Sequence, residues 1–230
     1  MSKTIETLIK DKGYRSADRW YPTSVDSFRN GFKAMWSDVE GYHPLVDNIA
    51  YSLQYLQFIE KELRELELSN VIYVMLVKTY VITGMSIIEG IFSYIIKSNG
   101  WWKMQDEDVM LSTKAQIRNS EGEEIIVKTE ISKKIEPYTG KMTLDEMIKC
   151  LNKHHSALKI DHIIYPQLNR IRDLRNRVHL QKGEDEKNHD YNAFDFKNKK
   201  EMQEILYAIL CSPNVTDSRV LFHYDFLKSE

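Results

Sequence analysis

The stretch VIYVMLVKTYVITGMSIIEGIFSYII, residues 71–96, decides the fold class of this chain. It is apolar along nearly its whole length, and roughly 20 apolar residues are enough to cross a bilayer. A helix that is apolar on nearly all sides is also typical of the centre of a helical bundle, where Gly84 and Gly90 would let neighbours pack closely. Lys78 and Glu89 interrupt the run and favour the core helix of a bundle over a membrane span.

Helical periodicity continues before this segment. Apolar residues spaced by three and four predict an amphipathic helix with a capping box at Thr23 and Asp26, and then a long helix after Pro44. In the long helix, the charged run 60–67 should occupy the faces away from the core. The core helix should start near Ser69 and form an antiparallel hairpin with the long helix. The apolar positions are Val25, Phe28, Phe32, Met35, Trp36 and Val39, then Leu45, Ile49, Leu53, Leu56, Ile59, Leu63 and Leu66.

After the core helix, which should end near Gly100, the helical period disappears between residues 101 and 142. Within this segment, residues 114–129 predict two short strands around turn-forming residues 119–122. We therefore expect a β-hairpin that lies outside the bundle.

Three more helices are expected after this hairpin. Thr143 and Glu146 form a capping box, Pro166 suits the first turn of a helix that runs to about Leu180, and Asp195 suits the N-cap of the last helix. The expected fold class is all-α, a helical bundle with a small β-hairpin insertion.

Composition and length agree with this fold class. The chain has 230 residues, 42% hydrophobic and 29% charged, with 9 Gly and 5 Pro, which excludes collagen-like, low-complexity and wholly disordered chains. We expect one soluble domain over residues 1–230, with residues 101–142 inserted into it. Two cysteines make no disulfide framework and no apolar leader opens residues 1–10, so the expected location is cytoplasmic. With 32 basic and 34 acidic residues, a nucleic-acid site must be a local basic patch.

The helix after Pro166 carries such a patch, because five basic residues stand against one acidic residue, Asp173, up to Lys182. On a helical wheel, four polar residues fall on one side, at the edge of the apolar stripe that should face the core. These four are Arg172, Arg175, Asn176 and His179. Arg170 and Arg177 point away and should be solvated. The alternative interpretation is an ordinary helix end, where the macrodipole favours cations.

The stretch LRNRVH, residues 174–179, resembles the HEPN superfamily, whose signature is an arginine followed, after four to six residues, by a histidine. Arg172 and His179 match it with six residues between them, and Glu89 is the lone acid of the long apolar helix in the same pattern. The resemblance covers about residues 45–210 without the insertion. It implies a HEPN-like helical bundle and a homodimeric, metal-independent endoribonuclease of a toxin or antiviral defence system. Its implied partners are RNA, a second copy, and a cognate antitoxin or defence-system protein, with no membrane.

The residue types suit that chemistry. Cleaving RNA without a metal requires proton transfer at the ribose 2′-hydroxyl and the leaving oxygen, and positive charge at the phosphate. His179 would transfer protons, and Arg172 or Arg175 would bind the phosphate, with Arg172 ranked slightly first because it satisfies the formal spacing. Asn176 would orient the imidazole or the substrate, and Glu89 would neutralise a motif arginine.

Other sites are not favoured by the sequence. A possible metal set lacks a tight ligand pair, so no metal is expected; its members are His154, His155, Asp161 and His162. Cys150 lies one helical turn from His154, but small thiols are common in buried helix faces. No glycine-rich phosphate loop can be read, so no cofactor is expected.

A second function stays open. In the commonest family wording three residues separate Arg-Asn from His, whereas only Arg177 and Val178 follow Asn176 here. The shortened gap favours a non-catalytic HEPN-like interaction or accessory protein, in which the motif stabilises a helix end and a dimer.

Overall fold

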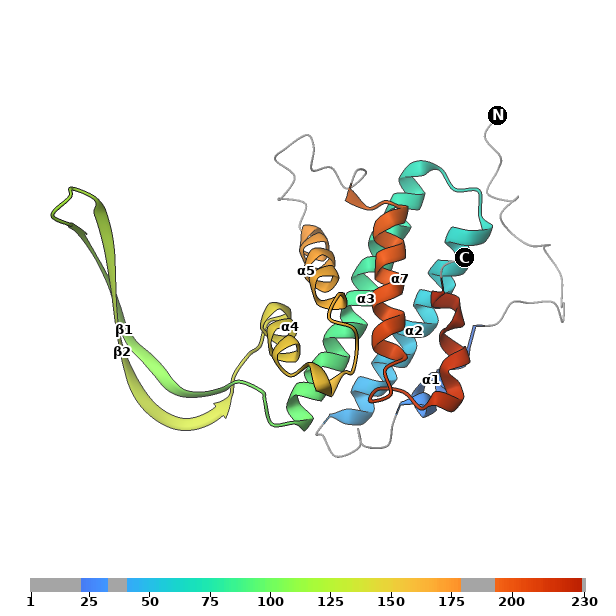
Figure 1. Ribbon diagram of the computed structural model, residues 1–230, viewed down its shortest axis with the longest axis horizontal. Coiled ribbons are helices and arrows are strands. Elements are labelled where there is room, and N and C mark those ends of the chain that lie inside the picture. The colour runs from blue at the N-terminus through green and yellow to red at the C-terminus, as the bar shows by residue number, and fades with distance from the viewer. Residues whose placement is uncertain (1–21, 33–40, 179–192, 229–230) are drawn as a thin grey trace.

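The computed structural model describes residues 22–32, 41–178 and 193–228, and shows a helical bundle with a two-stranded ribbon projecting from it (Figure 1). The main helices are α1 (Val25–Gly31), α2 (Tyr42–Glu65), α3 (Asn70–Ser98), α4 (Leu144–Lys153), α5 (Ile164–Arg175) and α7 (Phe196–Leu210). Short 3₁₀ segments are η3 (His155–Ala157), η4 (Asn176–Val178) and η7 (Ser218–Leu227). The mostly helical fold with a small hairpin agrees with the expected class.

Helix α3 is the centre of the bundle, since α2, α4, α5 and α7 all contact it. Its glycines lie at close helix contacts: a Cβ added to Gly84 would lie 2.9 Å from Met202 Cε of α7, and one on Gly90 would lie 3.2 Å from Leu45 Cδ1 of α2. Among the described helices, α3 alone is long and apolar enough to cross a membrane, a property that core helices share. Half of its most apolar window is buried inside the bundle.

The first helix is shorter than predicted. It ends at Gly31, because Phe32 has an extended backbone and pairs with Thr216 in an isolated antiparallel bridge. Its N-cap is Ser24, whose side chain accepts a hydrogen bond from the amide of Ser27, so the predicted capping box at Thr23 is wrong. The predicted continuation through Met35, Trp36 and Val39 lies outside the described residues.

The later helices begin near their predicted signals. Thr143 and Glu146 form the full capping box of α4, and the Asp195 side chain accepts a hydrogen bond from Asn198 at the start of α7. Helix α5 begins at Ile164, and it ends at Arg175, where the chain tightens into η4. The predicted extension to about Leu180 passes into residues outside the described part of the chain.

The predicted hairpin is present but its strands are longer than expected. β1 (Met104–Arg118) and β2 (Glu124–Thr139) pair antiparallel and extend away from the bundle (Figure 1). The turn forms because Asn119 Oδ1 accepts hydrogen bonds from the amides of Glu121 and Glu123, and Gly122 has a φ of +83°.

Candidate functional site

The candidate site is an open hollow where α5 meets α3 and the start of α4. Its volume is about 600 Å³, and its lining comprises Glu89, Thr143, Leu144, Asp145, Arg172, Arg175 and Asn176. Helix α5 is fixed by its buried face, which includes Leu168 and Ile171, so residues at the edge of that face open onto the hollow. The predicted convergence is confirmed for Arg172, Arg175 and Asn176. His179 lies outside the described residues.

Arg172 is surrounded by hydrogen-bond acceptors. Its guanidinium contacts Asp145 of α4, donates to Asp173 Oδ1 at 2.9 Å and donates to Asn169 Oδ1 at 3.1 Å. Partial burial lowers its pKa, but the hydrogen bonds to Asp173 and Asp145 outweigh this and leave the pKa raised. The Arg172 side chain is 18% exposed, and its contact with Asp145 links α5 to α4.

Asp145 is held in its charged form. The hydrogen bond from Lys149, followed by the charge of Arg172, lowers the pKa of the Asp145 carboxyl. Asp145 therefore carries a negative charge at neutral pH and competes with any phosphate for the Arg172 guanidinium.

Arg175 is held more loosely. Its Nη2 lies 3.3 Å from Glu89 Oε2 on α3, and the two side chains are 34% and 36% exposed. This contact confirms that Glu89 pairs with a motif arginine and identifies that arginine as Arg175. The long distance and the exposure leave the Arg175 guanidinium open to the hollow.

Arg170 is exposed and does not line the hollow, as predicted, but it also has a partner on another helix. Its side chain is half-exposed, but Nε donates a hydrogen bond of 3.0 Å to Oε1 of Glu201, a nearly buried carboxylate on α7. The helical wheel of α5 alone could not show this partner, because α7 lies about 30 residues further along the chain. Arg170 therefore links α5 to α7.

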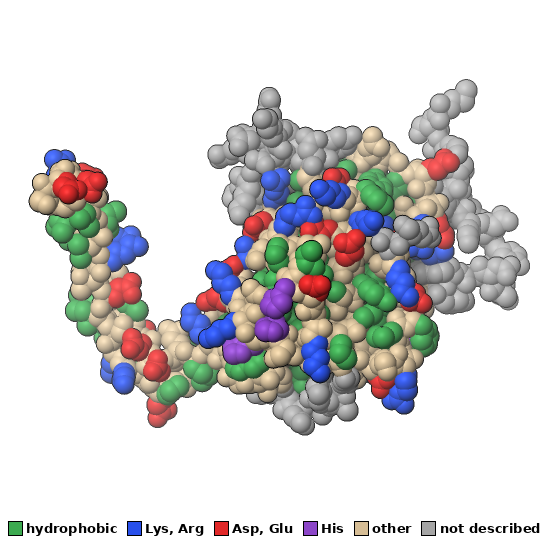
Figure 2. All heavy atoms as spheres, viewed as in Figure 1, with side chains coloured by type: hydrophobic (Ala, Val, Ile, Leu, Met, Phe, Trp, Pro, Cys, Tyr) green, Lys and Arg blue, Asp and Glu red, His purple; other side chains and the backbone are tan. Residues whose placement is uncertain are grey.

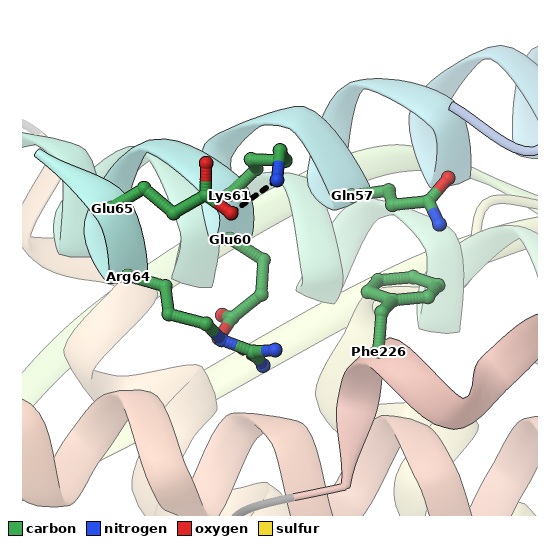
Figure 3. A pocket seen from close by; sticks show the side chains of 6 residues that line it. All are labelled: Gln57, Glu60, Lys61, Arg64, Glu65 and Phe226. Atoms are coloured by element: carbon green, nitrogen blue, oxygen red, sulfur yellow. Dashed lines mark hydrogen bonds and ion pairs between the residues drawn. The ribbon is translucent and has the colours of Figure 1, made fainter. Parts of the chain in front are cut away.

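A second, smaller hollow was not expected from the sequence. It measures about 150 Å³ and is lined by Gln57, Glu60, Lys61, Arg64, Glu65 and Phe226 (Figure 3). Glu60, expected on an outer face, is 3% exposed. Its Oε1 accepts from Lys199 Nζ of α7 at 2.8 Å and from Arg64 Nη2 at 3.3 Å. Glu60 is thus paired with two cations, and because Glu60 lies on α2 and Lys199 lies on α7, this pairing joins the two helices.

The histidines considered as metal ligands make ring contacts. His154 stacks on Trp101 with ring centroids 4.0 Å apart, and the rings of His155 and His162 are 4.5 Å apart. Histidines gather on the visible face of the bundle in Figure 2. Over residues 22–32, 41–178 and 193–228, no group of three or more His, Cys, Asp or Glu could hold a metal ion.

Cys150 is a poor nucleophile in this structure. Burial raises the pKa of its thiol, against the weaker opposing charge of Lys153. A raised pKa leaves less thiolate at neutral pH, and the thiolate is the reactive form. The Cys150 and His154 pair therefore does not compete with the hollow as a candidate site.

No protein-family model, curated protein or solved structure matches the chain. The function therefore has to be inferred from the residues of the hollow and from the motif that supplies them. Those residues combine two arginines, an asparagine and two carboxylates at the meeting point of three helices.

Proposed function

We propose that the protein is a metal-independent endoribonuclease of HEPN type that acts as a homodimer in a toxin or antiviral defence system. The observation that supports this most is the convergence of Arg172, Arg175 and Asn176 on one open hollow beside Glu89. On the helical wheel of the sequence these three residues share one side with His179. The side chains that line the hollow could therefore contact a phosphodiester backbone that enters it.

Within this proposal the two arginines have different roles. Arg172 already donates to three acceptors, two of them carboxylates, so binding a phosphate would require it to leave them. Among the described residues Arg175 makes one long contact, with Glu89, and charge-assisted hydrogen bonds to phosphate are shorter and stronger. Arg175 is therefore the phosphate ligand, and Arg172 is a positioning residue that fixes α5 against α4.

The proposed reaction is a transfer within the RNA strand. The ribose 2′-oxygen attacks the adjacent phosphorus while His179 takes the 2′-hydroxyl proton, and the bond from phosphorus to the 5′-oxygen breaks. The protonated His179 imidazole then returns this proton to the leaving 5′-oxygen, so the products are a 2′,3′-cyclic phosphate and a 5′-hydroxyl. Arg175 stabilises the negative charge that builds on the phosphoryl oxygens, and Asn176 orients the imidazole or the substrate.

The first test is incubation of the protein with total cellular RNA in excess chelator. Cleavage should persist, and the new ends should carry a 2′,3′-cyclic phosphate and a 5′-hydroxyl, because the internal hydroxyl is the nucleophile. End-labelling and mass spectrometry of the fragments measure this directly. Fragments that end in a 3′-hydroxyl would rule out the proposed reaction.

Substitution of the two arginines separates their roles. Arg175→Ala should slow single-turnover cleavage by about tenfold or more with little change in the free energy of unfolding, because it removes a phosphate ligand. Arg172→Ala should instead lower the free energy of unfolding by about 1–2 kcal/mol, because Asp145 and Asp173 lose a charged donor. Each variant is the control for the other. A stable Arg172→Ala protein with the larger loss of turnover would reverse the assignment.

One observation favours the second function, a non-catalytic interaction or accessory protein. Among the described residues that line the hollow the charges cancel, because Arg172 faces Asp145 and Arg175 faces Glu89. A hollow without net positive charge attracts polyanions weakly. If the wild-type protein cleaves no RNA, the motif would then serve to hold α3, α4 and α5 together.

A further inference from the structure

The ribbon formed by β1 and β2 has two chemically different faces in its outer half. Residues directly opposite each other in an antiparallel pair share a face, and alternate pairs lie on the same side. One side, here called the ribbon face, consists of Leu111, Thr113, Ala115, Ile117, Ile125, Val127, Thr129 and Ile131. The opposite side carries Ser112, Lys114, Gln116, Arg118, Glu124, Ile126, Lys128 and Glu130. The ribbon face contains no charged residue.

This face is uncovered in the described part of the chain. Leu111, Ile117 and Ile131 are 51%, 50% and 56% exposed, and hydrophobic side chains are visible along the projecting ribbon in Figure 2. A two-stranded hairpin alone is marginally stable in water and needs a further strand or a packed layer. Contiguous apolar surface of this kind marks an interaction site.

The charges of the ribbon argue against a polyanionic partner. Residues 104–139 carry eight acidic and five basic side chains. Glu121, Glu123 and Glu124 stand at the tip, where a nucleic-acid backbone or an anionic lipid surface would be repelled. Because the ribbon face itself is uncharged and apolar, the occupant should offer an uncharged apolar surface.

We propose that the ribbon face packs against the same face of a second copy of this chain, forming a two-layer sandwich of four strands. A two-fold contact requires a self-complementary patch, and an uncharged aliphatic face brings no charged side chain into the contact with its own copy. Two such faces, each with five large aliphatic side chains that are about half exposed, would bury about 1,000 Å² together, which is where specific interfaces begin. This contact is separate from the proposed RNA cleavage and does not depend on it.

The test compares two matched double variants by sedimentation velocity of the full chain at micromolar concentration. Ile117→Glu/Ile125→Lys places an opposite-charge pair across the strands of the ribbon face, which keeps the strands paired but removes the apolar contact. Gln116→Glu/Ile126→Lys places the same pair on the neighbouring, opposite face. The first variant should sediment at half the mass of the wild-type assembly, and the second should match the wild type. Equal masses for all three proteins would overturn the proposal.

Cross-linking locates the contact independently. Thr113→Cys lies near the centre of the ribbon face, and Lys114→Cys lies beside it on the opposite side. A short bismaleimide should cross-link two Thr113→Cys chains, whereas the yield of cross-linked Lys114→Cys chains should equal that of the wild type. The wild-type yield measures cross-linking through the native Cys150 and Cys211. Equal cross-linking of both variants would count against the ribbon face. RNA cleavage is measured in neither experiment, so the ribbon contact and the ribonuclease function can fail separately.

Discussion

Replacing His179 with alanine is expected to slow RNA cleavage by about a hundredfold or more. An imidazole has an ordinary pKa of about 6.5, so it can take and return a proton at neutral pH, whereas the neighbouring arginines stay charged. No other motif residue could replace it in proton transfer. Single-turnover cleavage of a defined RNA in chelator, with wild-type and His179→Ala protein, measures the loss.

The matched control is His155→Ala. His155 lies in η3, contacts His162 and is not part of the lining of the hollow, so its loss should leave the cleavage rate unchanged. Thermal unfolding of His155→Ala should stay close to wild type, since His155 is not part of the described hydrophobic core. The same measurement on His179→Ala separates a loss of catalysis from a loss of folding. Equal rates for wild-type and His179→Ala protein would favour the interaction-protein function.

Three features set by neighbours three or four residues apart could be read from the sequence, whereas the capping box expected at Thr23 was wrong by one residue. The capping box at Thr143, the N-cap at Asp195 and the turn after Asn119 each depend on one side chain and nearby amides. The central position of α3 could also be predicted, because a helix that is apolar on nearly all sides gains most when neighbours surround it.

Features set by distant partners could not be read. Helix α1 ends because Phe32 pairs with Thr216, nearly the whole chain away. The apolar spacing that runs on past Phe32 predicts a longer helix, since periodicity carries no information about such a bridge. Glu60 looked like part of a solvated charged run, but Lys199 of α7 makes its burial tolerable.

In the candidate site, too, local spacing could be read from the sequence but distant partners could not. The helical period was sufficient to place Arg172, Arg175 and Asn176 together. It could not rank the two arginines, because the difference comes from Asp145 on α4 and Glu89 on α3. Formal spacing ranks Arg172 slightly first, whereas the carboxylate contacts favour Arg175 as the residue open to substrate.

Replacing Lys199 with methionine is expected to lower the free energy of unfolding by about 3–5 kcal/mol. Lys199 and Glu60 are 9% and 4% exposed in their side chains, so removal of the cation leaves a buried carboxylate that, among the described residues, has Arg64 as its remaining cation. Among the described residues, Glu60 Oε2 has no hydrogen-bond partner even in the intact cluster. Urea and thermal unfolding of the variant measure the loss.

Lys103→Met is the matched control. Lys103 also reaches a glutamate on another element, Glu146 at 3.3 Å, but the two side chains are 58% and 39% exposed. Solvent screening makes such a surface pair worth at most about 1 kcal/mol, so this variant should unfold close to wild type. The comparison therefore separates the effect of burial from the effect of losing a lysine.

The double variant Glu60→Leu/Lys199→Met tests the physical cause. If the loss in Lys199→Met comes from an uncompensated buried charge, removing that charge as well should restore most of the stability, because apolar side chains of similar volume can replace a buried ion pair. Glu60 is 3% exposed, so its carboxylate lies in a poorly solvated part of the bundle, where burial and then the charge of Glu60 raise the pKa of the neighbouring Tyr80. A double variant as unstable as Lys199→Met would mean that packing, and not charge, holds α2 against α7 at this point.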